Sequence, residues 1–221
     1  MAESMIELRR RVCTANRALP KQQLVVMHSG NASGYEPESG RIVIKPSGMD
    51  YDEITPENLV EVDVASGEII GASLRPSVDL PHHLFLYRNL PGVRGIVHTH
   101  SNHATAFAAC LEPIPLCLTA IADEFGGPIP CAPYVSNEGD EIGRAILMHK
   151  TDSPAILLGN HGVFTWGDSV EAAVKAAVMV EDGAKTLILA RQLGVPRQLT
   201  SSEAAVWHER YANRYGQKRA A

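Results

Sequence analysis

GIVHTH, residues 95–100, joins a short run of β-branched residues to two histidines. Such runs favour β-strands, in which successive side chains point to opposite faces of the sheet. Because His98 and His100 are two positions apart, both imidazoles are expected on the same face. The segment therefore predicts a strand that ends in a pair of histidines able to chelate a metal ion.

The stretches around this segment predict a mixed α/β fold. Apolar runs bounded by turn residues indicate further strands at residues 24–27, 41–46, 59–64, 155–159 and 162–167. The stretch SGNASGYEPESG, at 29–40, is interpreted as a turn-rich connection. Helical periodicity and terminal prolines or glycines predict helices at residues 3–19, 79–90, 169–194 and 201–215. Because the strands gather in the middle of the chain, we expect an α/β sandwich around a mainly antiparallel sheet.

The composition of the whole chain excludes several classes of protein. Its 221 residues suffice for one substantial core, and no change of composition marks a linker, so we expect a single domain over residues 1–221. The net charge of -5 argues against a nucleic-acid or membrane-surface partner. No apolar stretch has the length of a membrane span and the start of the chain is charged, so a cytoplasmic protein is expected. The four widely spaced cysteines indicate reduced thiols.

Three histidines and one carboxylate are candidate metal ligands. Imidazole nitrogens suit zinc and neighbouring transition metals, and catalytic sites commonly use three protein ligands and keep one position open for substrate. His161 follows a strand that is interrupted at Gly159 and Gly162, where a permissive backbone would let its imidazole turn toward the HTH pair. Asp79 is a candidate fourth ligand, although taken alone it fits a helix N-cap better.

The remaining histidines fall into two groups. Those near the expected metal site are candidates for hydrogen bonds that orient the ligands, namely His82, His83 and His103. The others are interpreted as structural or surface residues: His28, His149 and His208.

Two short turns have the composition of anion-binding nests. SGNASG, at 29–34, places small residues around Asn31, and KPSG, at 45–48, adds the cation of Lys45. Glycine lets backbone N–H groups approach an anion closely, and the hydroxyls of Ser33 and Ser47 add donors. Clusters of this composition are more often plain turns. Since no nucleotide-binding glycine motif occurs, we expect any bound phosphate to belong to the substrate.

The order of these segments along the chain resembles the class II aldolase family over nearly the full length. The resemblance rests on Asp79 before LPHH and on the segments SGNASG, IKPSGMDYD, VHTHSNHAT, IADEFGG, NHGVFTWG and RYGQ. It implies a three-layer α/β/α fold with one divalent metal per subunit, zinc first and manganese or cobalt as alternatives. It also implies a homo-oligomer, a tetramer, whose active sites lie between neighbouring subunits.

The same resemblance implies roles for individual residues. The metal ligands would be Asp79, His98, His100 and His161. The phosphorylated substrate would be held by Gly30, Asn31, Ser47, Gly48 and Ser77, together with Lys45 and Val78. The acid/base pair would be Asp123 and Tyr215. Epimerases of the family often carry two serines where this chain has Ser77 and Val78, so one hydroxyl for the phosphate is missing. No acid or base is assigned to the segment 134–142, which is shorter than in some epimerases.

Within the family, the chain is most similar to the L-ribulose-5-phosphate 4-epimerases. The implied reaction is metal-dependent conversion of L-ribulose 5-phosphate to D-xylulose 5-phosphate by cleavage and re-formation of the C3–C4 bond. Alternatives on the same scaffold are a sugar-phosphate aldolase for L-fuculose or L-rhamnulose 1-phosphate, and a related dehydratase or decarboxylase. Fuculose-phosphate aldolases carry Glu at the position of Asp79, which favours the epimerase. A non-catalytic module like the adducin head is a further alternative, disfavoured by the three intact histidines.

Overall fold

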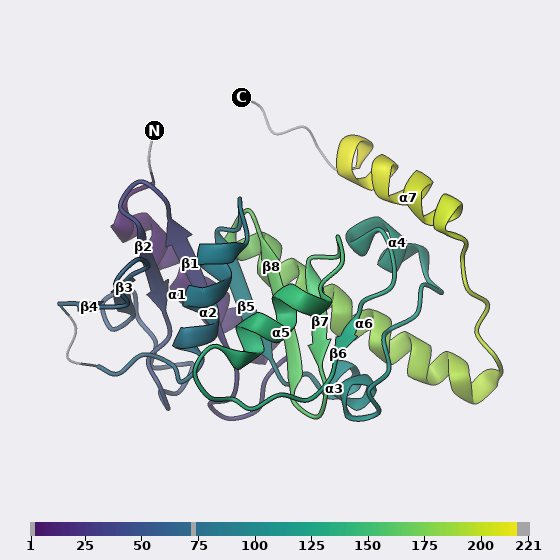
Figure 1. Cartoon of the computed structure of the whole chain (residues 1–221), viewed down its shortest axis with the longest axis horizontal. Helices are drawn as coiled ribbons and strands as arrows, with labels where there is room; N and C mark the ends of the chain where they lie inside the picture. The colour runs from purple at the N-terminus through teal and green to yellow at the C-terminus, as the bar shows by residue number, and fades with distance from the viewer. Residues whose placement is uncertain (1–2, 72–73, 216–221) are drawn as a thin grey trace.

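The computed structural model describes residues 3–71 and 74–215, so Gly216 and Gln217 of the RYGQ segment lie outside it. Figure 1 shows the arrangement of its helices and strands. In chain order they are α1 Met5–Lys21, β1 Asn31–Glu36, β2 Arg41–Ile44, β3 Val60–Asp63, β4 Ile69–Ile70, α2 Leu80–Asn89, β5 Gly95–Thr99, α3 Asn102–Ala109, α4 Thr119–Phe125, β6 Cys131–Ala132, α5 Glu141–His149, β7 Ala155–Leu158, β8 Gly162–Gly167, α6 Val170–Leu193 and α7 Ser201–Arg214.

The strands form one eight-stranded sheet in the spatial order β4-β3-β2-β1-β5-β8-β7-β6. Only β6 and β7 pair in parallel, and every other neighbouring pair is antiparallel. The expectation of a mainly antiparallel sheet is therefore confirmed. The GIVHTH strand, β5, lies between β1 and β8 in the interior of the sheet, where hydrogen bonds on both edges restrain its backbone.

Helices cover both faces of this sheet and give the three layers that were expected (Figure 1). On one face, Ile42 and Ile44 of β2 join the core beneath α2 and α5. On the other face, Val43 joins the core beneath α1 and the first part of α6. The rest of α6 packs with α3, α4 and α7 in a third cluster at the end of the sheet. Alternation of side chains along each strand thus supplies apolar surface to both helical layers.

The strand expected at residues 24–27 does not form. The backbone there is irregular, with a positive φ of 54° at Met27, and β1 instead occupies 31–36, inside the stretch interpreted as a turn. Small residues suit that position because α1 packs closely on β1. A Cβ atom on Gly34 would lie 2.6 Å from Leu8 and 2.8 Å from Val12. Tertiary packing therefore decides which of the two segments becomes the strand.

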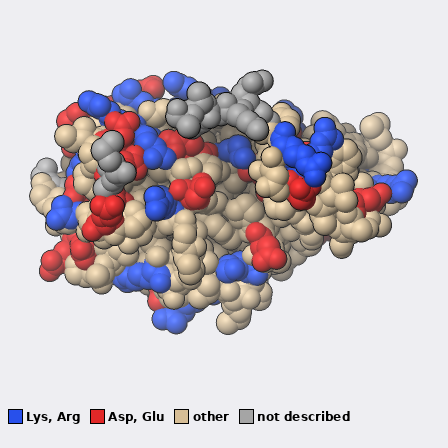
Figure 2. All heavy atoms as spheres, turned by 90° about the horizontal axis from the view of Figure 1, so that it is seen from above, with Lys and Arg blue, Asp and Glu red and all other residues tan. Residues whose placement is uncertain are grey.

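The surface charges and the lengths of the helices bear on the expectations from the sequence. Figure 2 shows acidic and basic side chains interspersed over the upper face, among the atoms drawn in colour. No helix in the described part of the chain combines the length and apolar character that a membrane crossing requires. The cysteines, Cys13, Cys110, Cys117 and Cys131, are all free thiols.

A row of glycines lets α6 begin directly against the sheet. Gly34 of β1 pairs with Gly95 of β5, and Gly95 pairs with Gly167 of β8. A Cβ atom on Gly95 would overlap the backbone of Ser169 and Val170, where α6 begins. Backbone atoms cannot move aside as the end of a side chain does, so this contact requires glycine.

We predict that Gly95→Ala lowers the free energy of unfolding by about 3 kcal/mol, because the added methyl group must push α6 away from the sheet. Urea titration followed by circular dichroism measures the change. Gly127→Ala is the matched control, since a Cβ atom there meets nothing within 4 Å. Equal stability of the two variants would contradict the close approach of α6.

Candidate metal centre and substrate cavity

His98, near the end of β5, is held rigidly by the neighbouring strand β8. Its ring is buried and stacks on Phe164, with centroids 4.4 Å apart and planes inclined by 22°. Its Nδ1 donates a hydrogen bond of 2.9 Å to the carbonyl oxygen of Val163. A neutral imidazole that donates from Nδ1 keeps the lone pair on Nε2. The contact therefore leaves Nε2 of His98 free to bind a metal ion.

His100 and His161 complete a cluster of three imidazoles around that atom. Nε2 of His98 lies 3.0 Å from Nε2 of His100. The ring centroid of His161 lies 4.9 Å from that of His98 and 5.1 Å from that of His100. One ligand nitrogen from each residue lies within 4.8 Å of the others. In the described part of the chain, this is the one such group of histidine, cysteine or carboxylate side chains.

The turn between β7 and β8 brings His161 into this cluster. The residue with the left-handed backbone is Asn160, with φ 56°, and not either of the flanking glycines. Gly162 is needed for space, because a Cβ atom there would lie 2.5 Å from the carbonyl oxygen of Thr99 and 2.8 Å from the ring of His100. The predicted role of the glycines is thus corrected: close packing of two chain segments, and not φ, requires Gly162.

The surroundings keep these imidazoles uncharged, as metal binding requires. Burial lowers the pKa of His98 far below its ordinary value, and the neighbouring His100 and His161 lower it further, while Asp79 opposes them. Burial also lowers the pKa values of His100 and His161. Three neutral nitrogen donors that converge from rigid elements fit a divalent ion such as zinc.

Asp79 occupies the N-cap position of α2 but does not cap the helix with its side chain. Its carboxylate instead accepts hydrogen bonds from Asn31, at 2.7 Å, and from Ser77, at 3.3 Å. Burial raises the pKa of this carboxyl, whereas the histidines, in their protonated forms, and the hydrogen bond from Asn31 lower it, and the net shift is downward. Asp79 is therefore a buried carboxylate that lines the cavity and does not cap the helix, although its oxygen atoms are not part of the group of ligand atoms that the three histidines form.

A cavity of about 150 Å³ opens beside the histidines. The described residues that line it include every predicted metal-ligand and substrate-binding residue: Gly30, Asn31, Lys45, Ser47, Gly48, Ser77, Val78, Asp79, His98, His100 and His161. These residues come from segments far apart in the sequence, and the register between β1 and β5 explains part of their convergence. Asn31 pairs directly with His98.

Lys45 contributes a buried positive charge to this cavity. Its side chain is 2 % exposed, and its ammonium donates one long hydrogen bond of 3.4 Å to the carbonyl of Pro46. It also lies 4.9 Å above the ring of Tyr51. Burial lowers the pKa of Lys45, and Asp50 and Asp79 oppose that effect. Among the described residues no carboxylate lies within ion-pair distance of Lys45, so this site is suited to an anionic ligand.

Two lining residues were missed in the sequence, His28 and Asn137, whereas Ser29, which also lines the cavity, belongs to the predicted SGNASG segment. His28 was interpreted as a structural or surface residue, whereas it faces the cavity and its Nδ1 lies 3.0 Å from Asp50. Its place immediately before the SGNASG segment was the available signal. Asn137 comes from the segment 134–142, where no periodicity or motif marks it.

Other residues that were expected near the site have structural contacts instead. Ser33 does not face the cavity, because its hydroxyl is buried between Nδ1 of His83, at 2.7 Å, and the hydroxyl of Tyr87, at 2.8 Å. His103 does not contact the metal-ligand histidines. Its Nδ1 lies 2.6 Å from Glu181 of α6, whose carboxylate also accepts hydrogen bonds from the first turn of α3.

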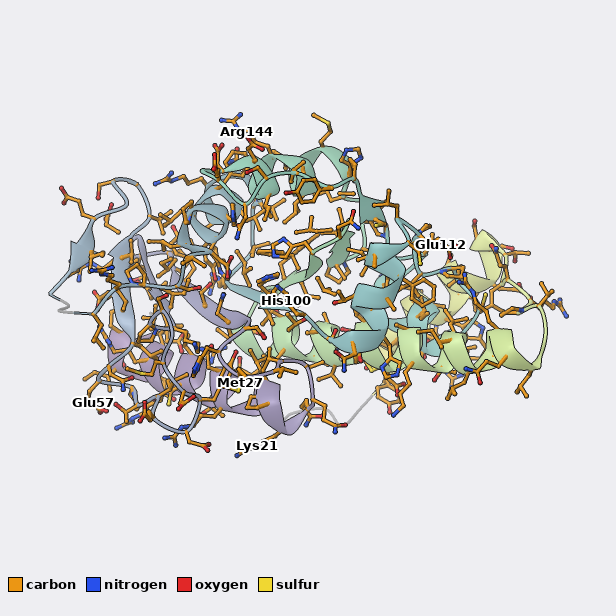
Figure 3. All side chains as sticks on the ribbon, turned by 90° about the horizontal axis from the view of Figure 1, so that it is seen from below. Lys21, Met27, Glu57, His100, Glu112 and Arg144 are labelled. Atoms are coloured by element: carbon orange, nitrogen blue, oxygen red, sulfur yellow. The ribbon has the colours of Figure 1, made fainter. Side chains whose placement is uncertain are left out.

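Asp123 and Tyr215 do not line the cavity of their own chain. Asp123 belongs to α4, and its backbone carbonyl accepts a hydrogen bond of 2.8 Å from His208 of α7. Tyr215 directly follows α7, is 74 % exposed, and stacks its ring on that of Tyr211. Figure 1 shows α7 at the upper right of the molecule, beside α4. Figure 3, a view from below, shows His100 near the middle of the molecule. Within one chain the two groups of candidate residues are therefore separate.

The fold and this site define a class of metal-binding α/β proteins, and sequence comparison identifies the family. The model of the class II aldolase and adducin N-terminal domain matches residues 10–188, so the chain belongs to this family. Members of the family with aldolase activity use a divalent metal, in accord with the three-histidine cluster.

Solved structures agree with this assignment. An L-fuculose 1-phosphate aldolase is 27% identical, with a TM-score of 0.85 over 96% of this chain and 98% of that one. YgbL from Escherichia coli, whose description leaves open an aldolase, an epimerase or a decarboxylase, is 26% identical, with a TM-score of 0.81 over 93% of this chain and 100% of that one. L-fuculose-1-phosphate aldolase from Thermus thermophilus, 24% identical with a TM-score of 0.70 over 88% of this chain and 100% of that one, supports the fold alone.

We predict that the purified protein binds one zinc ion per chain and that His161→Ala weakens this binding by at least about a hundredfold, because it removes one of three nitrogen donors. Equilibrium dialysis with elemental analysis measures it. His103→Ala is the control, since His103 pairs with Glu181 outside the cluster. Equal zinc content in the two variants would contradict the assignment of the metal centre.

Proposed function

We propose that the protein is a zinc-dependent sugar-phosphate enzyme that epimerises L-ribulose 5-phosphate at C4 by breaking and re-forming a carbon–carbon bond. The observation that carries this proposal is the single cavity shared by the three-histidine cluster and the buried ammonium of Lys45. A substrate with a chelating keto-alcohol end and a phosphate end matches those two features. The membership of the class II aldolase family supports the same chemistry.

His98, His100 and His161 would hold the ion, with Asp79 as the fourth ligand. A divalent ion bound there supplies Lewis-acid polarisation of a substrate carbonyl oxygen. Zinc is favoured because three of the ligands are imidazoles, while manganese and cobalt can be bound by the same four ligands. Asp79 is already anionic and is oriented by Asn31, so it can add negative charge beside the histidines without a proton transfer.

The substrate phosphate would lie against Lys45. The hydroxyls of Ser47 and Ser77 and the backbone of Gly30 and Gly48 line the same cavity. Val78, which replaces a hydroxyl residue found in many epimerases, is 70 % exposed and offers no donor. Fixing the phosphate lets the rest of the cleaved fragment turn, so that the bond re-forms on the other face of its carbonyl carbon.

Asp123 and Tyr215 would act as the acid/base pair from a neighbouring subunit. The resemblance to the family supports these roles. A proton donor must lie within hydrogen-bond reach of the reacting oxygen, and neither residue lines the cavity of its own chain, so in these roles both would have to reach the cavity of another subunit. One would remove the proton from the C4 hydroxyl and the other would return a proton after the bond re-forms. The proposal therefore includes a closed homo-oligomer, a tetramer, in the cytoplasm.

Cleavage of L-fuculose 1-phosphate is the second candidate. It is supported by the L-fuculose 1-phosphate aldolase structure, 27% identical over almost the whole of both chains. Both reactions require a metal centre and a phosphate contact. In the aldolase reaction the phosphate lies on the dihydroxyacetone fragment and both fragments leave, whereas in the epimerase reaction it lies on the glycolaldehyde fragment and the two fragments recombine before release. Asp79 favours epimerisation, since fuculose-phosphate aldolases resembling this chain carry the longer Glu at that position.

We predict that the zinc-loaded protein converts L-ribulose 5-phosphate to D-xylulose 5-phosphate, that chelation abolishes turnover, and that added zinc restores it. Coupled assay and NMR of the products measure the reaction, with L-fuculose and L-rhamnulose 1-phosphates tested in parallel. Asp123→Asn should lower kcat by about a hundred- to ten-thousandfold, as removal of a positioned acid or base does. Metal-dependent release of dihydroxyacetone phosphate from one of the two 1-phosphates, without epimerisation of L-ribulose 5-phosphate, would identify the protein as an aldolase and contradict the epimerase proposal.

We predict that co-expression of Asp123→Asn with His161→Ala restores activity that neither variant has alone. If subunits mix at random in equal amounts, about a quarter of the sites in a ring join an intact cavity to an intact neighbouring acid/base residue. Turnover of the mixed oligomer relative to wild type measures this fraction. A folded mixed oligomer without activity would place Asp123 outside the shared site.

A further inference from the structure

The loop before α5 brings an amide to the mouth of the cavity. Asn137 is exposed on this loop and lines the cavity with the metal-ligand and phosphate-site residues. Its Oδ1 lies 2.7 Å from Nε2 of His82, a residue in the first turn of α2. The side chain is therefore tied to a helix that the core holds in place, although the loop itself is on the surface.

The protonation of His82 determines which end of the Asn137 amide faces the ligand. The ring of His82 is 1 % exposed, and its Nδ1 has no hydrogen-bond partner among the described residues. A proton on Nδ1 would leave a buried N–H without an acceptor, whereas an unpaired lone pair costs less. The proton therefore belongs on Nε2, which donates to Oδ1 of Asn137. The two N–H donors of the amide remain available to another group.

The amide lies beside the metal-ligand residues. Asn137 lines the same cavity as these residues, and its partner His82 follows Asp79 by three residues at the start of α2. The amide does not titrate, so it can position an oxygen atom but cannot transfer a proton. A neutral donor of this kind matches a carbonyl or hydroxyl oxygen, whereas the phosphate is matched by the cation of Lys45.

We propose that Asn137 is a substrate-binding residue whose Nδ2 donates a hydrogen bond to a hydroxyl or carbonyl oxygen of the sugar chain, and that His82 is the positioning residue that holds its amide. The proposal rests on the function proposed above, since it requires a sugar phosphate in this cavity. It assigns to the segment 134–142 a binding role in place of an acid or base.

The experiment compares Asn137→Ala with Ser136→Ala, a neighbour on the same loop that does not line the cavity. For the sugar phosphate that the wild-type protein turns over, Asn137→Ala should lower kcat/KM by about tenfold, the cost of one lost hydrogen bond. Zinc content and the inhibition constant of inorganic phosphate should stay at wild-type values, because neither depends on the amide. Ser136→Ala should match the wild type in all three measurements.

A double-mutant cycle of His82 and Asn137 tests the role of His82. His82→Ala should lower kcat/KM as Asn137→Ala does, and the double variant should be no worse than either alone, because both remove the same contact. His82→Gln retains an amide donor and should recover part of the loss, and it serves as the folded variant if the alanine change at this buried position prevents folding.

Two results would overturn the inference separately from the proposed function. Wild-type kcat/KM in Asn137→Ala, with an active wild-type enzyme, would remove Asn137 from the site and leave the proposed function intact. Additive losses in the double variant would separate His82 from Asn137. Failure of the wild-type protein to bind or turn over any of the three sugar phosphates would instead reject the proposed function, and this inference with it.

Discussion

The pairing of β5 with both of its neighbours is the constraint on which the site depends. β1 places Asn31 beside His98 on one edge, and β8 places Phe164 and the carbonyl of Val163 beside it on the other. These contacts determine the position, ring orientation and protonation of the first metal-ligand histidine before any ligand binds. Hydrogen bonds on both edges of a strand leave its backbone little freedom, so the site inherits the rigidity of the sheet.

The cavity also contains buried polar groups whose burial would not increase the stability of the fold. Lys45 is almost fully buried without a carboxylate within ion-pair distance, and the pKa values of Lys45 and His98 are lowered by that burial. Burial of such groups lowers the stability of the fold unless a partner compensates them. A divalent ion and a phosphorylated ligand would supply these partners, so the same buried groups that lower the stability of the ligand-free protein would bind the ligands.

The proposed function would divide the chemistry between two parts of the molecule. The cavity gathers the candidate ligands and phosphate contacts, while Asp123 and Tyr215 lie on α4 and at the end of α7, which pack on one another. A rotational oligomer brings one part of a chain against the other part of its neighbour, and heterologous contacts of this kind close into rings. In the proposed oligomer, assembly would complete each site, and it would place the exposed side chain of Tyr215 against the cavity of a neighbouring subunit.

The sequence alone determined the features that depend on the spacing of residues a few positions apart. Alternation along a strand predicted that His98 and His100 share a face, and helical periodicity predicted α6 and α7, because both patterns repeat within a few residues. The strand expected at 24–27 was wrong, and the short helices α3, α4 and α5 were not predicted. Only tertiary structure decided that the small residues of β1 pack beneath α1, and that His28 and Asn137 face the cavity. Contacts between segments far apart in the chain create those environments, and no local pattern records them.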